Sequence, residues 1–306
     1  MNPIIHIRSH WRRLSFAAAG ALVLATWLGL PTQALAQAPF ATPELAADAL
    51  IQAVATSDKA AVTQVLGKDA KRMLPLDDFS AGDRYTFLEK AHQSRAVKVD
   101  GKRAELVVGN DPWTLPIPVV QGADQRWRFD PAAGREAMLV RRIGANELST
   151  IQTALAYVDA QREYAQVDRN GNGVLEYAQK LISSPGKRDG LIWPLSLGDE
   201  SPLGEGFLPA RPGEGYHGYR FKILTGQGPA ASGGARSYLI GKRMVAGFAL
   251  VAWPVQYGRT GVMSFIVDQD AQIFERDLGP NTASVAAAIQ HFDPVPGWQP
   301  ITQAPQ

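Results

Sequence analysis

The sequence predicts an α+β protein in which helices pack against antiparallel sheets in two successive modules. In some segments the apolar residues recur at three- and four-residue spacing, which is typical of amphipathic helices; in others they alternate with polar residues, which is typical of half-buried strands. Residues 37–142 indicate helices followed by a curved, cone-like antiparallel sheet. Residues 143–293 indicate a long helix packed on a second antiparallel sheet.

The first 36 residues have the layout of a secretory signal peptide. Arginines near the N-terminus precede an apolar run over residues 14–30, and Ala34 and Ala36 form an A-x-A cleavage site. The alternative is an uncleaved anchor, because an apolar run of this length can just span a bilayer. Polar residues within the run favour cleavage after Ala36. We therefore expect a periplasmic or secreted protein that is not stably inserted in the membrane.

The composition narrows the class of function. The chain has 306 residues, 45% of them hydrophobic, and no cysteine, which excludes disulfides, thiolate metal sites and a cysteine nucleophile. Residues 1–36 hold three arginines and no acidic residue, so 28 of the 31 Lys and Arg residues remain beside 29 Asp and Glu residues. No basic surface with interleaved aromatic residues is evident. We therefore expect no nucleic acid among the partners.

In the first module the pattern predicts helices first and strands afterwards. Residues 42–44 (Thr-Pro-Glu) favour a helix start, because proline suits the first helical position, and a second helix is expected over residues 59–66. Beyond Leu88 the apolar period changes to two, with a turn at Asp100-Gly101. Two prolines within residues 113–119 place that run at a sheet edge. The pattern is similar to the cone-shaped fold of nuclear transport factor 2.

The second module is predicted to begin with the clearest helix in the chain. Asn146 suits an N-cap, and apolar residues then recur at helical spacing as far as Ala165. The helix should end near Asp168, where the glycines of residues 170–173 tolerate positive φ. Residues 142–146 are therefore the expected boundary between the modules.

The rest of the second module is predicted to be mainly strands. A short helix is expected over residues 175–182, followed by a loop rich in Gly and Pro. The apolar run over residues 244–253 indicates a strand that is buried on both faces. The remaining segments, in chain order, are a loop over 186–215, strands over 219–223, 262–267 and 272–276, a helix over 282–291 and a Pro-rich tail over 294–306.

Several strings of residues resemble a family of exported Gram-negative proteins known as domain of unknown function 2950. The resemblance covers the whole mature chain and implies export, but it brings no established activity. The second half is also similar to the head of type IV pilin-like proteins, although their membrane helix and processing signal are absent. The strings are Arg142-Ile-Gly-Ala-Asn-Glu-Leu148, Tyr157-Val-Asp-Ala-Gln-Arg-Glu-Tyr164, Gly186-Lys-Arg-Asp-Gly-Leu-Ile-Trp-Pro194, Gly215-Tyr-His-Gly-Tyr219 and Ala249-Leu-Val-Ala-Trp-Pro254.

Residues 168–179 have the spacing of a calcium-binding loop. Oxygen donors at alternate positions can surround a hard cation, while Gly173 allows a sharp bend. Gln179 stands where such a loop needs a bidentate Glu, so we expect weak affinity for calcium. The alternative is an Asn/Gly cap at the end of the long helix. The candidate ligands are Asp168, Asn170, Asn172, the carbonyl of Val174, and Glu176.

His217 is the candidate for acid–base chemistry. It follows the long loop, and Asp189 or Glu200 within that loop could orient it as a general base. No nucleophile signature accompanies these residues. The alternative is a structural histidine that is hydrogen-bonded to the loop backbone.

Two functions from different classes are consistent with these patterns. The first is a non-catalytic envelope protein that binds a small ligand or an envelope protein through the loop and the junction between the modules. The second is a hydrolase-like enzyme that uses His217 with Asp189 or Glu200. Catalysis requires groups that are placed together, so the scattered carboxylates favour the first. A carboxylate within hydrogen-bond reach of His217 in a pocket would favour the second.

Overall fold

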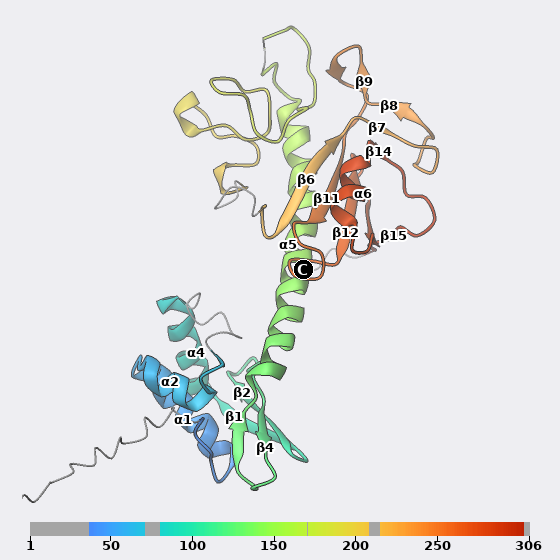
Figure 1. Ribbon diagram of the computed structural model, residues 1–306. Helices are drawn as coiled ribbons and strands as arrows, with labels where there is room; N and C mark the ends of the chain where they lie inside the picture. Colours follow the sequence, from blue (N-terminus) through green and yellow to red (C-terminus); the bar gives the residue numbers. More distant parts are fainter. Residues whose placement is uncertain (1–36, 71–79, 170, 208–214, 303–306) are drawn as a thin grey trace, which may run out of the picture.

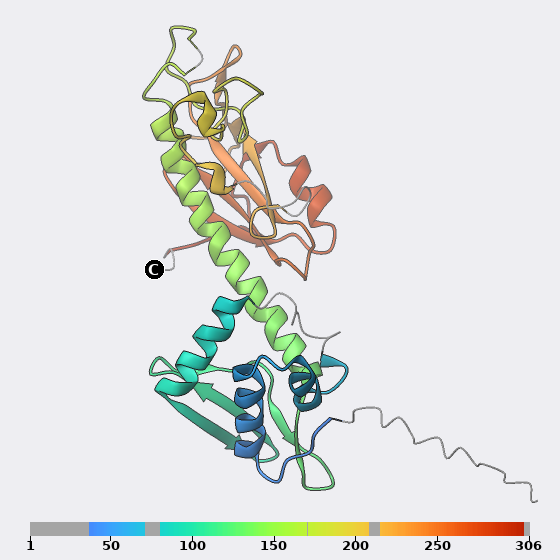
Figure 2. The ribbon, with the colours of Figure 1, turned by 90° about the vertical axis from the view of Figure 1, so that its left-hand side faces the viewer.

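The protein consists of two lobes joined by one long helix (Figures 1 and 2). The computed structural model describes residues 37–70, 80–169, 171–207 and 215–302. Helices pack against antiparallel sheets in both lobes, which confirms the predicted α+β class. The predicted signal peptide, residues 1–36, lies outside the described residues.

The first lobe packs helices against one face of a small sheet. The strands are antiparallel in the order β1-β2-β4-β5, and β3 also pairs with β2. Helix α1 begins at Pro43, as predicted, and its N-cap is Thr42, whose hydroxyl accepts a hydrogen bond from the N–H of Leu45. The elements are α1 (Pro43–Ala55), α2 (Lys59–Leu66), α4 (Ala81–Gln93), β1 (Arg95–Asp100), β2 (Arg103–Val108), β3 (Trp113–Thr114), β4 (Val119–Gln121) and β5 (Trp127–Phe129).

Two details of the first lobe differ from the sequence-based expectation. Helix α4 was not predicted, although Ser80 and Asp83 form a capping box at its start. The run over residues 113–119 is two short strands, and β4 lies between β2 and β5 instead of at an edge. The edge prediction holds for β3, which pairs only with β2 among the described strands, and is wrong for β4. Both prolines fall between the two strands, where they interrupt no hydrogen-bonded pair.

Helix α5 (Pro131–Tyr164) runs from the first lobe into the second (Figure 2). Its N-cap is Asp130, whose carboxylate accepts hydrogen bonds from two backbone N–H groups of the first turn. The prediction of Asn146 as the N-cap is therefore wrong, and Asn146 instead donates from Nδ2 to the carbonyl of Thr260 at 2.8 Å. The expected boundary, residues 142–146, lies inside this helix. The buried clusters of the two lobes are separate, one over residues 46–129 and one over residues 151–298.

The second lobe is an antiparallel sheet with α5 on one face and α6 (Thr282–Ala288) on the other (Figure 1). The strand order is β15-β13-β12-β11-β6. Every residue of β11 is buried, which confirms the second half of the strand predicted over residues 244–253. The first half is wrong, because Met244 ends β10 and residues 245–248 belong to no strand. The strands are β6 (Tyr219–Leu224), β11 (Ala249–Pro254), β12 (Met263–Asp268), β13 (Ile273–Asp277) and β15 (Gln299–Pro300).

Shorter elements complete the second lobe. They are two 3-10 turns, a two-stranded pair, and a three-stranded sheet in the order β14-β7-β8. Their bounds are η2 (Leu195–Leu197), η3 (Glu205–Phe207), β7 (Gly226–Gln227), β8 (Arg236–Ser237), β9 (Leu239–Ile240), β10 (Arg243–Met244) and β14 (His291–Phe292).

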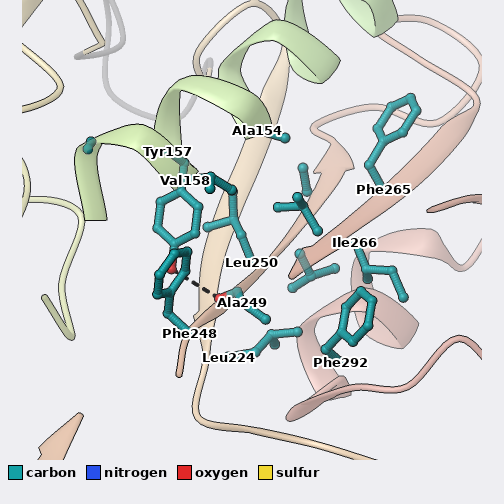
Figure 3. Close-up of a cluster of buried hydrophobic side chains, with 14 of the residues drawn as sticks. Ala154, Tyr157, Val158, Leu224, Phe248, Ala249, Leu250, Phe265, Ile266 and Phe292 are labelled. Carbon is teal, nitrogen blue, oxygen red and sulfur yellow. Dashed lines mark hydrogen bonds between the residues drawn. The ribbon is translucent and has the colours of Figure 1, made fainter. Parts of the chain in front are cut away.

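The core of the second lobe forms where α5 meets the sheet (Figure 3). Tyr157 and Val158 of α5 are fully buried against Leu250 of β11 and Phe248. The Tyr157 hydroxyl donates to the carbonyl of Ala249 at 3.2 Å, so the polar end of this ring is satisfied. Burying each large apolar side chain stabilises the fold by roughly 1.5–3 kcal/mol. The second half of α5 is therefore part of the second lobe.

The helix predicted over residues 175–182 is absent, and this segment forms neither a helix nor a named strand. The backbone N–H of Ala178 donates to Oε1 of Gln161 at 2.8 Å, and Nε2 of Gln161 donates to the carbonyl of Ala178 at 2.8 Å. The N–H of Tyr177 donates to the carbonyl of Met244. These partners replace the intrahelical hydrogen bonds that a helix would have needed.

Candidate ligand-binding groove

A groove of about 730 Å³ lies between the middle of α5 and the turn that precedes β6. This volume falls within the range of about 300–1,000 Å³ that is typical of small-molecule sites. Among the described residues that line it, none is Asp, Glu, Lys or Arg. We call it the α5 groove, and its lining residues are Leu148, Ser149, Gln152, Thr153, Ala156, Phe207, Tyr216 and His217.

One wall of the α5 groove is a stripe along α5. Its residues recur at three- and four-residue spacing from Leu148 to Ala156, so their side chains lie on one face of the helix. Small side chains in the middle of this stripe leave room for the groove. The hydroxyl of Thr153 donates to the backbone carbonyl of Ser149 at 2.7 Å, which leaves the oxygen of Thr153 available as an acceptor.

The opposite wall is aromatic. The rings of Phe207 and Tyr216 are stacked, with centroids 4.8 Å apart and an interplanar angle of 22°. The His217 ring meets Tyr216 edge-on at 4.3 Å. Stacked and edge-to-face rings of this kind add to the stability of an aromatic cluster. The three rings therefore form a continuous surface that faces the helix.

A tight turn places His217 in this wall. Tyr216 and Tyr219 exchange both backbone hydrogen bonds, at 2.9 and 3.0 Å, so only two residues form the turn. Both have positive φ, 47° at His217 and 73° at Gly218, as a type I′ turn requires. A side chain at Gly218 would lie 2.8 Å from Cβ of Thr260, so the turn packs closely against its neighbours. A histidine at positive φ is uncommon, and such residues concentrate at functional sites.

Hydrogen bonds hold the turn and α5 together beside the groove. Tyr219 is fully buried, and its hydroxyl donates to the carbonyl of Met263 at 2.8 Å. Burial, and then the nearby Glu147, raise the pKa of Tyr219, so the phenol stays protonated as a donor. Oε1 of Glu147 accepts hydrogen bonds from the backbone N–H groups of Val262 and Met263. Both walls of the groove are therefore fixed to the same strand, β12.

Two of the sequence strings that resemble a known family lie where α5 and the turn before β6 are both hydrogen-bonded to β12. Asn146 and Glu147 belong to the first string, and Gly215–Tyr219 forms the fourth. Residues 37–301 match the model of the family described as protein of unknown function, DUF2950. The chain belongs to this family. Comparison with curated proteins and with solved structures finds no match, so the likeness to pilin heads stays a prediction.

In this DUF2950 protein, His217 lines the groove but the two predicted carboxylates have other surroundings. Oδ1 of Asp189 accepts from the backbone N–H of Ser184, and Oδ2 accepts from Nζ of Lys180, each at 2.7 Å. Although burial opposes ionisation, these bonds lower the pKa of Asp189 to about 2. Glu200 is exposed. Within the described ranges, no hydrogen bond joins His217 to either carboxylate.

The predicted calcium loop is a turn beyond the end of α5, whose C-cap is Ala165, and Asp168 accepts hydrogen bonds from the backbone of this turn. The two carboxylate oxygens of Asp168 accept from the backbone N–H groups of Asn172 and Gly173, at 3.1 and 2.7 Å. Nδ2 of Asn172 donates to the buried Glu176 at 2.6 Å. Asn170 lies outside the described residues. In the part of the chain that is described, no group of three or more Asp, Glu or His side chains is placed to hold a metal. Calcium binding stays a prediction.

An arginine that the sequence analysis did not single out secures the long loop of the DUF2950 protein. The Arg169 guanidinium lies over the rings of Trp193 and Tyr164, at 5.2 and 5.9 Å from their centroids. It also pairs with Asp199 at 3.2 Å, and Asp199 pairs with Arg188 at 2.8 Å. This network holds the loop against the end of α5, so the loop is a fixed part of the lobe.

Most lining residues of the groove were also missed. An exposed Leu148 on an otherwise polar helix face was the available signal, since small residues follow it at helical spacing. Phe207 gave no such signal, because only the tertiary fold stacks it on Tyr216. In the described part of the chain, no helix has both the length and the apolar character needed to cross a bilayer.

Proposed function

We propose that this protein is an exported, non-catalytic envelope protein that binds a small ligand in the α5 groove. The observation that carries this proposal is the groove itself, in which aromatic rings face a polar helix stripe across about 730 Å³. Sites for small molecules combine apolar walls with a few polar groups that fix the orientation of the ligand. The hydrogen bonds of Asn146 and Glu147 hold the walls in place, which lowers the cost of ordering them on binding.

The contacts of the first described residues support export. Nε2 of Gln37 donates to the carbonyl of Phe129 at 2.7 Å, and the N–H of Ala38 donates to the carbonyl of Gln64. The chain is thus packed onto the first lobe from residue 37, where the family match also begins. Cleavage after Ala36 would leave these contacts intact. N-terminal sequencing of protein from a periplasmic fraction should give Gln37, and a membrane-bound chain beginning at Met1 would contradict export.

Binding is better supported than hydrolysis. A general base needs a positioned partner that holds its ring in the productive tautomer. His217 has aromatic neighbours, while Asp189 accepts its hydrogen bonds from Lys180 and Ser184. The hydrolase that pairs His217 with Asp189 or Glu200 is therefore the second candidate.

Amide NMR spectra of the mature chain test the binding proposal. Pools of sugars, amino acids, dipeptides and nucleosides are added in turn to the wild type. We expect one pool to cause saturable shifts confined to residues 148–156 and 216–217, and Tyr216→Ala to abolish them. Tyr85→Ala is the matched control, because this tyrosine is 71% exposed and lies in the other lobe. Shifts confined to residues outside the groove, or none with any pool, would contradict the proposal.

A further inference from the structure

We propose that the ligand of the α5 groove is a short, uncharged oligosaccharide. This inference rests on the proposed function and adds the chemical class of the ligand. Charge, ring geometry and the available hydrogen-bonding groups each contribute to it.

The charge of the lining indicates an uncharged ligand. The eight residues around the groove include no Asp, Glu, Lys or Arg. Removing an ionised group from water is costly unless an opposite charge compensates for it. A carboxylate, phosphate or ammonium group would find no such partner among the described lining residues of the groove. The lining therefore favours a ligand that is polar but not ionised.

The aromatic wall suits the flat face of a sugar ring. Phe207 and Tyr216 lie nearly parallel, with an interplanar angle of 22°, and together present an extended apolar surface. A pyranose ring has a face of C–H groups and an edge of hydroxyl groups. The C–H face can lie on the electron-rich face of an aromatic ring, while the hydroxyl edge stays free for hydrogen bonds. The wall thus accommodates one face of such a ring without desolvating its polar edge.

The polar groups in the groove match hydroxyl groups. Three side chains in the groove can both donate and accept hydrogen bonds, as the hydroxyl groups of a sugar can. They are the hydroxyls of Ser149 and Tyr216 and the imidazole of His217. Among the residues that the structure describes, none of these three side chains makes a hydrogen bond. The oxygen of Thr153 adds an acceptor, since its hydrogen is donated to the carbonyl of Ser149. A purely apolar ligand would leave all of these groups unsatisfied.

An extended peptide fits this groove less well. Peptides commonly bind by adding a strand to an exposed sheet edge, where backbone groups provide the affinity. The wall formed by α5 offers side chains, because the backbone N–H and C=O groups there are paired within the helix. Peptide binding is therefore one of the outcomes that the experiment must distinguish.

The test uses the mature chain with maltotriose and with the trimer of N-acetylglucosamine as neutral probes. The trimer of galacturonic acid and trialanine are the comparison probes. We expect at least one neutral sugar to shift the amide signals of residues 148–156 and 216–217 saturably. Calorimetry should then show Kd raised at least tenfold by Tyr216→Ala, and unchanged by Tyr85→Ala. Phe207→Leu is the second variant, since it keeps apolar volume but removes the stacked ring.

The outcomes separate this inference from the proposed function. Groove signals that shift only with the acidic trimer would overturn the uncharged character of the ligand, and signals that shift only with trialanine would overturn the oligosaccharide. Either result would leave a binding groove. If a neutral sugar binds but neither Tyr216→Ala nor Phe207→Leu weakens the binding, the sugar does not lie on the aromatic wall, and this part of the inference is overturned. If no probe here, and no pool of the broader NMR screen, shifts the groove signals, both proposals fail.

Discussion

Glu147 and Met263 are 116 residues apart in the sequence, and the Glu147 carboxylate accepts a hydrogen bond from the backbone N–H of Met263 at 3.0 Å. The same oxygen accepts from Val262 at 2.8 Å. One side chain therefore satisfies two backbone donors at the start of β12 and fixes α5 to the sheet. Because Leu148 and Ser149 follow directly in the helix, this contact also sets the position of the α5 groove.

Removing the Glu147 carboxylate should destabilise the second lobe. Glu147→Ala leaves two half-buried N–H groups without a partner, so we expect the free energy of unfolding to fall by about 1–3 kcal/mol. Glu147→Gln keeps an acceptor oxygen and should cost less. Urea denaturation measures both. Glu136→Ala, on the exposed face of the same helix, is the control and should stay within about 0.5 kcal/mol of the wild type.

The stability of the second lobe should depend on pH through Glu275. Burial, and then the charge of Glu147, raise the pKa of Glu275 above its ordinary value of 4.5. The folded state thus favours the protonated form, and stability is lost as the pH rises from the unfolded-state pKa through the folded-state pKa. Glu275→Gln should therefore be more stable than the wild type at pH 7, and the difference should shrink below pH 4.5. A difference that is the same at both pH values would refute this.

Substitutions at His217 should separate the contribution of its backbone conformation to stability from the contribution of its imidazole ring. Asn tolerates positive φ, so His217→Asn should unfold at nearly the same temperature as the wild type. His217→Val puts a β-branched residue at φ 47° and should cost about 1–3 kcal/mol. Thermal unfolding followed by circular dichroism compares the two. Equal melting temperatures would mean that the turn opens at little cost.

Asp168 should stabilise its turn with or without calcium. Asp168→Ala removes the acceptor of two backbone N–H groups of the turn, and we expect a loss of about 1 kcal/mol that is the same in calcium and in chelator. Nε2 of Gln179 donates to the carbonyl of Lys242, so Gln179→Glu should also destabilise. Calcium at tenfold excess over Kd would instead raise stability by about 1.4 kcal/mol. A melting temperature that rises with calcium only when Asp168 is present would establish the metal site.

Two glycines of α5 should respond oppositely to alanine. An added Cβ at Gly144 has no atom within 4 Å, so Gly144→Ala should stabilise the helix by about 0.5–1 kcal/mol. At Gly134 the Cβ would lie 2.9 Å from Cγ1 of Ile117, and Gly134→Ala should destabilise the first lobe. Both variants are measured by urea denaturation. Stabilisation by Gly134→Ala would mean that the contact with Ile117 relaxes freely.

Elements with a strong local pattern were predictable from the sequence. Helix α2, the β1–β2 hairpin and the β12–β13 pair lie where alternation and helical spacing placed them. The sequence placed the start of α5 too late in the chain. The middle of this helix, around Arg141 and Arg142, is exposed and has no apolar stripe that would have shown that its two halves form one helix. The pair Asp130-Pro131, an N-cap residue followed by a proline, is a sequence pattern that indicates the true start of this helix.

Contacts between distant segments account for what the sequence could not predict. Residues 175–182 have helical spacing, yet the side chain of Gln161 binds both backbone groups of Ala178, and the segment forms no helix. The α5 groove likewise needs Phe207 beside Tyr216, which no local pattern specifies. His217 lines the groove, but its neighbours are aromatic rings where carboxylates were considered.

The continuous helix α5 also sets the direction in which the first lobe faces. Each residue of an α-helix advances about 1.5 Å and rotates about 100° around the axis, since a turn takes 3.6 residues. One residue inserted between Arg141 and Ala145 would therefore turn the first lobe by about 100° relative to the second. Four inserted residues would move it by about 6 Å and bring it to within about 40° of its original direction. Every lining residue of the α5 groove lies beyond this point in the chain. An activity that needs both lobes in a fixed relative orientation should therefore be lost on insertion of one residue. An activity that needs the groove alone should be unchanged.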